Sequence, residues 1–199
     1  MTCKFSRGSL VLTMLVFGLL ITSCSAQEPG YSNAHIVELS QEELSKGNSE
    51  QADALADGEV DSSEYEEAYW NLRRCLEGYG YTVTDAYLNP VTQLNYDFLI
   101  DGAGHDQYEV NRRVDDCEER YWLAVSRVYV LTQPHVMAEP LKQSLVECLS
   151  QKGTNVDTNF VNLGELVDFP QVEMGDAIDC INERIPLLYP ELPAYSISF

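Results

Sequence analysis

The stretch DGEVDSSEYEEAYWNLRRCLEGYGYTV, residues 57–83, decides the fold of this chain. Within it Asp61 is a typical helix N-cap residue, and Glu64 lies three positions later. This spacing predicts a capping box, in which the Asp61 carboxylate accepts a hydrogen bond from a first-turn N–H and Glu64 accepts one from the Asp61 N–H. We therefore expect a helix to begin directly after Asp61.

Apolar residues follow Asp61 at spacings of three and four, which is the period of one buried helix face. They are Tyr65, Ala68, Tyr69, Leu72, Leu76 and Tyr79. Cys75 lies beside this face, and Gly78 and Gly80 are typical of a helix end. The aromatic and β-branched residues from Tyr81 onward predict that the chain then becomes extended.

Two strand-like runs, 81–88 and 94–100, flank an Asn89-Pro90 turn. Residues of these types between two runs rich in aromatic and β-branched side chains predict a β-hairpin. Tyr81, Tyr87, Tyr96 and Phe98 lie on this hairpin. They serve either as core and sheet packing, which we favour, or as an aromatic face for a partner.

Two further helices are expected around the central helix and the hairpin. A short one covers 49–56, with Gly58 just past its end. A long one covers about 108–131, with Cys117 on its inner face and charged residues outside, and Pro134 ends it.

A weaker copy of the cysteine segment returns downstream. CLEGYGYTV at 75–83 corresponds to CLSQKGTNV at 148–156, because both contain Cys-Leu, then a glycine, then a valine eight positions after the cysteine. We interpret this as a degenerate duplication of a helix with a cysteine. Coincidence is the alternative, since Cys-Leu on a helix is common.

The second copy lies on a helix that carries Leu141, Leu145, Cys148 and Leu149 and stops at Gly153. A last helix is predicted over about 172–185, carries Cys180 and is ended by Pro186. The tail, 187–199, shows no helical period, and we expect it to lie over the surface.

The N-terminus has the pattern of an export signal. Lys4 and Arg7 precede an apolar run over 10–21, which is too short to span a membrane. The run ends in ITSC, which resembles a bacterial lipobox and marks Cys24 as the lipidated residue. The alternative is an ordinary secretory signal cleaved after Ala26.

The chain is strongly acidic, with a formal net charge of −20 over 199 residues. Removal of a signal peptide over 1–23, which holds Lys4, Arg7 and no acid, changes this charge to −22. Such a protein repels nucleic acid and anionic lipid headgroups. Its attachment to the membrane must come from N-terminal acyl chains such as palmitate.

Four of the six cysteines are left to form disulfides after Cys3 departs with the signal and Cys24 takes lipid. An even number in an exported chain is typical of a disulfide framework. We favour the pairs Cys75–Cys117 and Cys148–Cys180, which staple one unit each. The crossed alternative is Cys75–Cys148 with Cys117–Cys180, which would make one interleaved bundle.

The segment 53–64 has the charge pattern of a calcium loop, with acids at its first, fifth, ninth and twelfth positions: Asp53, Asp57, Asp61 and Glu64. Leu55 occupies the third position and has no oxygen to offer. We therefore predict no high-affinity calcium site, and no other metal or cofactor. A helix stopped by Gly58 and followed by a capped helix explains the same residues.

Catalytic signatures are missing from the chain. The three histidines, His35, His105 and His135, are not spaced for a metal and lie in expected linker or loop sequence. Asp101, His105 and Asp106 are interpreted as a solvated loop, with a polar site as the alternative. Nucleophile-elbow, metalloprotease, P-loop and dinucleotide motifs do not occur.

Three segments together resemble an uncharacterised group of secreted or lipid-anchored actinobacterial lipoproteins. They are LADGEVDSSEYEEAY, CLEGYGYTV and CEERYWLAVSRVY, and they lie within residues 55–129. The resemblance implies export, lipidation and the cysteine framework. It implies no activity, because none is assigned to that group.

These observations predict an α+β fold, in which a helix–β-hairpin–helix unit is followed by a mainly helical unit and each is stapled by a disulfide. The expected divisions are a signal peptide, an acidic linker, the first unit, and the second unit with its tail: 1–23, 24–50, 51–134 and 135–199. A short helix near Glu42 is the one element considered within the linker.

The expected function is a lipid-anchored, extracytoplasmic binding or accessory module of the cell envelope, without catalysis. Its partner would be an envelope protein or a glycan, and it would not bind nucleic acid. The alternatives are a carboxylate-based cell-envelope hydrolase and a calcium-stabilised surface or adhesion module. Two facing carboxylates in a cleft would favour the hydrolase, and an exposed aromatic face would favour binding.

Overall fold

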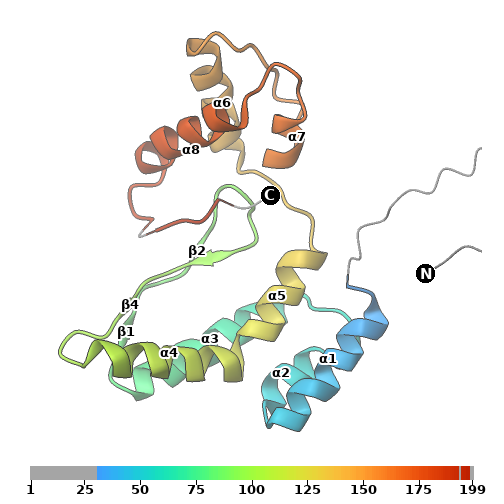
Figure 1. Ribbon diagram of the computed structural model, residues 1–199, viewed down its shortest axis with the longest axis vertical. Helices are drawn as coiled ribbons and strands as arrows, with labels where there is room; N and C mark the ends of the chain where they lie inside the picture. The colour runs from blue at the N-terminus through green and yellow to red at the C-terminus, as the bar shows by residue number, and fades with distance from the viewer. Residues whose placement is uncertain (1–30, 193, 198–199) are drawn as a thin grey trace, which may run out of the picture.

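The computed structural model describes residues 31–192 and 194–197. Over these ranges the chain is an α+β protein that is mostly helical, with eight helices and a few short antiparallel strands (Figure 1). No helix in these ranges has the length and hydropathy needed to span a membrane. The expected signal peptide, Cys3 and Cys24 lie outside the described residues and stay predictions.

Helices α1 (Asn33–Lys46) and α2 (Ser49–Ala54) begin the described fold. The short helix α2 was expected, and α1 falls within the acidic linker, where only a short helix near Glu42 was considered. The greater length of α1 has a tertiary cause. Ile36 is buried in the core, and the buried Ser40 hydroxyl donates to the Ala52 carbonyl at 2.7 Å, so α1 is held by α2 rather than by a strong amphipathic pattern.

Helix α3 (Ser62–Gly78) confirms the expected central helix and its capping box. The Glu64 N–H donates to Asp61 Oδ1, and the Asp61 N–H donates to Glu64 Oε2, each at 2.9 Å. Its buried face is Tyr65, Ala68, Tyr69, Leu72 and Leu76. Tyr79 was expected on that face but is 40% exposed, because the helix ends at Gly78 and Tyr79 follows as its C-cap.

The two related cysteine segments end their helices in the same way. After Cys75, the Tyr81 N–H donates to the Leu76 carbonyl at 3.2 Å, around Gly80 at a φ of 85°. After Cys148, on α6 (Glu139–Gln151), the N–H of Thr154 donates to the Leu149 carbonyl at 2.9 Å, around Gly153 at a φ of 91°. Both are Schellman motifs that need a left-handed residue at the same offset from the cysteine.

The expected hairpin is present as two short antiparallel ladders. They pair β1 (Thr82–Val83) with β4 (Ile100–Asp101), and β2 (Tyr87–Leu88) with β3 (Tyr96–Asp97). Thr82 faces Asp101 in the first ladder, whereas Tyr87 faces Asp97 in the second. The segment between β1 and β2 therefore has one residue more than the segment between β3 and β4, which is a β-bulge.

The long helix expected over 108–131 is instead two helices, α4 (Gln107–Tyr121) and α5 (Leu123–Thr132), broken at Trp122. Neither glycine nor proline marks this break. Gln51 on α2 stabilises it: its Oε1 accepts from the N–H groups of Ala124 and Val125 at the start of α5. A side chain far away in the sequence therefore decides where the helix divides.

Helices α6, α7 (Leu163–Val167) and α8 (Met174–Leu188) form the last part of the fold. Pro186 was expected to end the last helix but lies inside α8. A proline this close to the end removes one hydrogen bond, and the next turn still closes, since the Tyr189 N–H donates to the Ile185 carbonyl at 2.9 Å. The tail is partly buried against α6–α8 through Leu192, Tyr195 and Ile197.

Both disulfides have the favoured pairing. Cys75–Cys117 joins α3 to α4, and Cys148–Cys180 joins α6 to α8. The crossed pairing is therefore wrong. Each bridge lies in a different buried cluster, one built by α3, α4 and the hairpin and one built by α6–α8.

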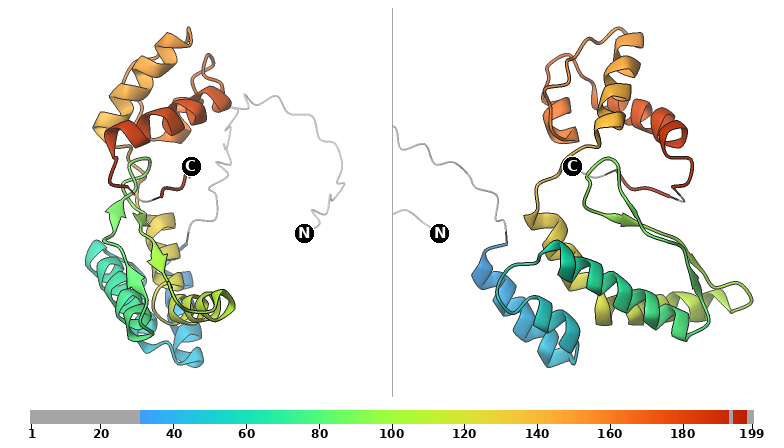
Figure 2. Two further views of the ribbon diagram at one scale, coloured as in Figure 1. Left: turned by 90° about the vertical axis from the view of Figure 1, so that its left-hand side faces the viewer. Right: turned by 180° about the vertical axis from the view of Figure 1, so that it is seen from behind.

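The hairpin links these two parts of the molecule, as Figures 1 and 2 show from three sides. Its tip carries Val91 into the cluster of α6–α8. The Ala138 N–H donates to the Pro90 carbonyl at 2.9 Å, and the Val136 N–H donates to that of Thr92 at 3.0 Å. At its other end the hairpin packs on α3, where the Tyr69 hydroxyl donates to the Thr84 carbonyl at 3.0 Å and residues of α3 and β2 line one groove.

Candidate functional site

A groove of about 470 Å³ lies between the outer face of α3 and strand β2. Four of its nine lining residues are aromatic, and we call it the aromatic groove. The lining residues are Glu66, Tyr69, Trp70, Arg73, Asp85, Ala86, Tyr87, Leu88 and Tyr96. Its volume falls within the range of about 300–1,000 Å³ that is usual for ligand sites.

Tyr69 forms the rigid base of the aromatic groove. It is buried, and its hydroxyl donates to the Thr84 carbonyl at 3.0 Å. The rings of Trp70 and Tyr96 lie edge-on to it, each with its centroid 5.3 Å away. Trp70 nevertheless remains 43% exposed, so the groove presents a large ring held in place by a buried one.

At one end of the groove lies an ion-pair network around Arg73. Its Nε lies 2.8 Å from Glu77 Oε1, and one terminal nitrogen lies 3.1 Å from Asp85 Oδ1. These two carboxylates raise the pKa of Arg73, the hydrogen bond to Glu77 most of all. The guanidinium also lies 5.4 Å from the Trp70 ring centroid, which is a cation–π distance.

The other end of the groove carries the carboxylate of Glu66. This group accepts a hydrogen bond from the Trp70 indole N–H at 3.3 Å. Among the described residues no Lys, Arg or His nitrogen comes within 4.0 Å of it. The pKa of the neighbouring Tyr96 is raised, first by burial and then by the negative charge of Glu66. This end therefore combines ring surface with an uncompensated negative charge.

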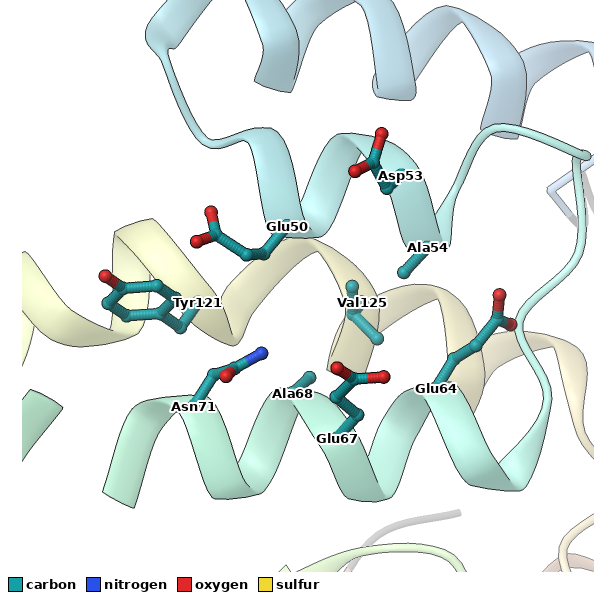
Figure 3. Close-up of a pocket in the computed structure, with 9 residues that line it drawn as sticks. All are labelled: Glu50, Asp53, Ala54, Glu64, Glu67, Ala68, Asn71, Tyr121 and Val125. Carbon is teal, nitrogen blue, oxygen red and sulfur yellow. The ribbon is translucent and has the colours of Figure 1, made fainter. Parts of the chain in front are cut away.

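A second, smaller cavity of about 280 Å³ lies between α2 and α3, over the break between α4 and α5 (Figure 3). Four carboxylates line it from both sides, Glu50 and Asp53 from α2 and Glu64 and Glu67 from α3. Ala54, Ala68 and Val125 supply its apolar surface, and Asn71 and Tyr121 complete it. We call it the acidic cavity.

Two of these carboxylates have pKa values displaced in opposite directions. Burial raises the pKa of Glu64, against the hydrogen bond that it accepts from the Asp61 N–H. The pKa of Glu50 is lowered by hydrogen bonds from its own backbone N–H and from the Ser49 hydroxyl. Divergent carboxyl pKa values across one cavity are a feature of acid–base sites.

The residues of the calcium-like loop do not converge on one point. Asp53 and Glu64 line the acidic cavity, whereas Asp57 accepts from the Glu59 N–H at 3.1 Å and Asp61 caps α3. Within residues 31–192 and 194–197 no group of three or more His, Cys, Asp or Glu side chains is placed to hold a metal. The absence of high-affinity calcium binding stays a prediction for titration calorimetry.

The three histidines lie apart from both cavities and from one another. His35 lies in α1, not in a linker, with its ring 5.0 Å from that of Tyr31. His135 bonds to the Val130 carbonyl at 3.1 Å. The ring of His105 meets the buried Tyr81 edge-on at 5.0 Å.

The two aspartates at the end of the hairpin and in the loop after it accept hydrogen bonds from nearby backbone N–H groups. Asp101 accepts from the Ala103 N–H at 2.8 Å. Asp106 accepts from the N–H groups of Tyr108 and Glu109 and so caps α4. Each aspartate thus serves its own turn or helix end, and whether Asp101, His105 and Asp106 act together as a polar site stays a prediction.

Sequence reasoning identified only part of the aromatic groove. Of the four hairpin aromatics, Tyr87 and Tyr96 line it, while Tyr81 and Phe98 pack into the cluster around α3 and α4. Glu66, Trp70 and Arg73 were missed. Their spacing of four and three puts them on one outer face of α3, and an exposed tryptophan opposite the buried stripe was the available signal.

Comparison of this chain with known protein families, curated proteins and solved structures found no match.

Proposed function

We propose that this protein is a lipid-anchored, extracytoplasmic binding or accessory module of the cell envelope, and that the aromatic groove is its binding surface. The observation that carries the proposal is the half-exposed Trp70, held against buried Tyr69 at the wall of a ligand-sized groove. Exposed tryptophan and tyrosine with a few polar groups are the usual components of a recognition surface.

The placement outside the cytoplasmic membrane belongs to the same proposal. The lipobox-like segment ending at Cys24 supports a lipid anchor. The two disulfides support an oxidising compartment, where such bonds persist. The resemblance to lipid-anchored actinobacterial proteins supports the same location.

A division near residue 134 into two disulfide-linked units is also proposed. It is supported by the separate buried clusters around the two bridges. The first unit would carry the groove, and the second would hold the hairpin tip through Val91 and so keep strand β2 beside α3. The binding surface would then depend on both units.

Site-specific photo-crosslinking in intact cells tests this function. A photoreactive amino acid at Leu88, which is 49% exposed at the groove, is compared with one at Tyr108, which is 79% exposed on α4. We expect a discrete envelope adduct from Leu88, lost in Trp70→Ala, and none from Tyr108. Identical adducts from both positions, or none from Leu88, would contradict the proposal.

A second candidate function, a carboxylate-based hydrolase, is favoured by the four carboxylates that line the acidic cavity and the divergent pKa values of Glu50 and Glu64. We place the hydrolase second because its cavity, at about 280 Å³, lies just below the range of about 300–1,000 Å³ that is usual for ligand sites. Release of soluble fragments from purified cell wall, abolished by Glu67→Gln and retained by the exposed control Glu147→Gln, would establish it. We expect no release.

A further inference from the structure

We propose that the ligand of the aromatic groove is a cationic side chain, lysine or arginine, presented by a basic segment of a partner protein. This inference rests on the proposed function and names the chemistry of the partner. Its starting point is the Glu66 end of the groove, where ring surface and an uncompensated carboxylate occur together.

The charges of the groove are unequal. Arg73 is the only cation among the lining residues, and it is already bound by Glu77 and Asp85. Glu66 adds a further negative charge that no cation among the described residues offsets. A neutral ligand that covered the Glu66 carboxylate would remove the water bound to it and offer no equal interaction in return. A cationic ligand would replace that water with an ion pair.

The rings of the groove favour the same ligand. The face of an aromatic ring attracts a cation within about 6 Å, tryptophan most strongly. Trp70 already contacts one cation in this way, since Arg73 lies 5.4 Å from its centroid. Tyr87 and Tyr96 add ring surface beside it, and the exposed Leu88 offers an apolar contact for the stem of a long cationic side chain.

The charge of the whole molecule agrees with this choice. A formal net charge of −20 attracts a basic partner and accelerates its encounter, and it repels anionic glycans and nucleic acid. A neutral saccharide gains nothing from that field. Two of the polar groups that would bind its hydroxyls, Arg73 and Asp85, are also already paired with each other at 3.1 Å.

Titration calorimetry on the full chain, with its disulfides formed and stripped of membrane by detergent, tests the inference. The probes are a capped hexapeptide of alternating lysine and leucine, the same peptide with glutamine for lysine, and a tetramer of N-acetylglucosamine. We expect only the lysine peptide to bind. Its affinity should fall about tenfold in Trp70→Ala and about fivefold in Glu66→Gln, with partial recovery in Trp70→Phe.

Matched variants separate recognition at the groove from general attraction to an acidic protein. Glu147→Gln removes one exposed charge on α6, and Tyr108→Ala removes one exposed ring on α4, and neither should change the affinity. Equal weakening by Glu66→Gln and Glu147→Gln, or no binding of the lysine peptide, overturns the inference. Saccharide binding that is lost in Trp70→Ala would overturn the cationic ligand and leave the proposed function standing. Circular dichroism verifies that each variant is folded.

Discussion

Gln51 on α2 donates from Nε2 to the carbonyl of Glu119 at 2.7 Å, across the break that separates α4 from α5. The same side chain accepts from the N–H groups of Ala124 and Val125 at 2.8 and 3.2 Å. Gln51 is only 1% exposed. One buried amide therefore satisfies the backbone on both sides of a helix break that has no glycine or proline.

Replacement of Gln51 should be costly for this reason. We expect Gln51→Leu to lower the free energy of unfolding by about 3 kcal/mol, because it removes the acceptor of the Ala124 and Val125 N–H groups, although the Glu119 carbonyl keeps a hydrogen bond from Asn48. Urea unfolding measures the change. Gln143→Leu, on the exposed side of α6, is the control and should change stability by less than about 0.5 kcal/mol. Equal effects in the two variants would show that Gln51 does not stabilise the break.

The docking of α1 can be tested with two glycines in the same backbone conformation. Gly47 and Gly58 have φ values of 88° and 87°, but a Cβ at Gly47 meets open space, whereas one at Gly58 lies 2.8 Å from the Asn33 carbonyl oxygen. Gly47→Ala should therefore cost only the conformational term, about 1 kcal/mol. Gly58→Ala should cost about 3 kcal/mol, since backbone must also move. Similar unfolding midpoints would mean that α1 does not pack here.

The disulfides should account for a large part of the stability. The bridges Cys75–Cys117 and Cys148–Cys180 close separations of 42 and 32 residues. Chain entropy predicts about 4 kcal/mol for each. Paired alanine variants of either bridge should unfold at clearly lower denaturant, and peptide maps without reductant should show only these two links. A melting transition unchanged by reductant would contradict the prediction.

Asp97 should make stability depend on pH. Burial raises its pKa to about 6, against hydrogen bonds from the Asn89 side chain and the Ser196 backbone. A raised carboxyl pKa means that the folded state favours the protonated form, so the contribution of Asp97 to stability is greatest below about pH 4 and falls as pH rises through 6. With allowance for partial exposure, the loss is about 1 kcal/mol.

Asp97→Asn should remove this part of the pH dependence, because an amide does not ionise and can still accept from Asn89. Urea midpoints measured from pH 4 to pH 7.5 compare the variant with the wild type. The two curves should diverge between pH 4 and 6 and stay parallel above. Curves that are parallel over the whole range would refute the assignment.

The proposed lipid anchor rests on Cys24, which lies outside the described ranges. We expect Cys24→Ala to release the protein from the membrane fraction or to block its processing, because two or more acyl chains give stable attachment at about 0.8 kcal/mol per buried methylene. Fractionation and labelling with a fatty acid check this. Incorporation of label at the N-terminus of the variant would exclude Cys24 as the lipidated residue.

The sequence by itself determined the features that depend on neighbouring residues. The capping box of Asp61 and Glu64 lies within one turn, and the glycine stops after Cys75 and Cys148 need only a left-handed residue at a set offset. The hairpin followed from its turn residues. The pairing of the four cysteines followed from helices that bracket a short insert, so the partners were near in sequence.

Other features depend on tertiary structure, because contacts between residues that are distant in the sequence stabilise them. Burial of Ile36 makes a helix of a stretch whose own pattern is weak, and Gln51 divides a segment whose own period is continuous. The aromatic groove arises in the same way. Trp70 on α3 and Tyr87 on β2 line one groove because the hairpin packs on α3 while its tip is held by α6–α8, and no local pattern in either segment specifies that approach.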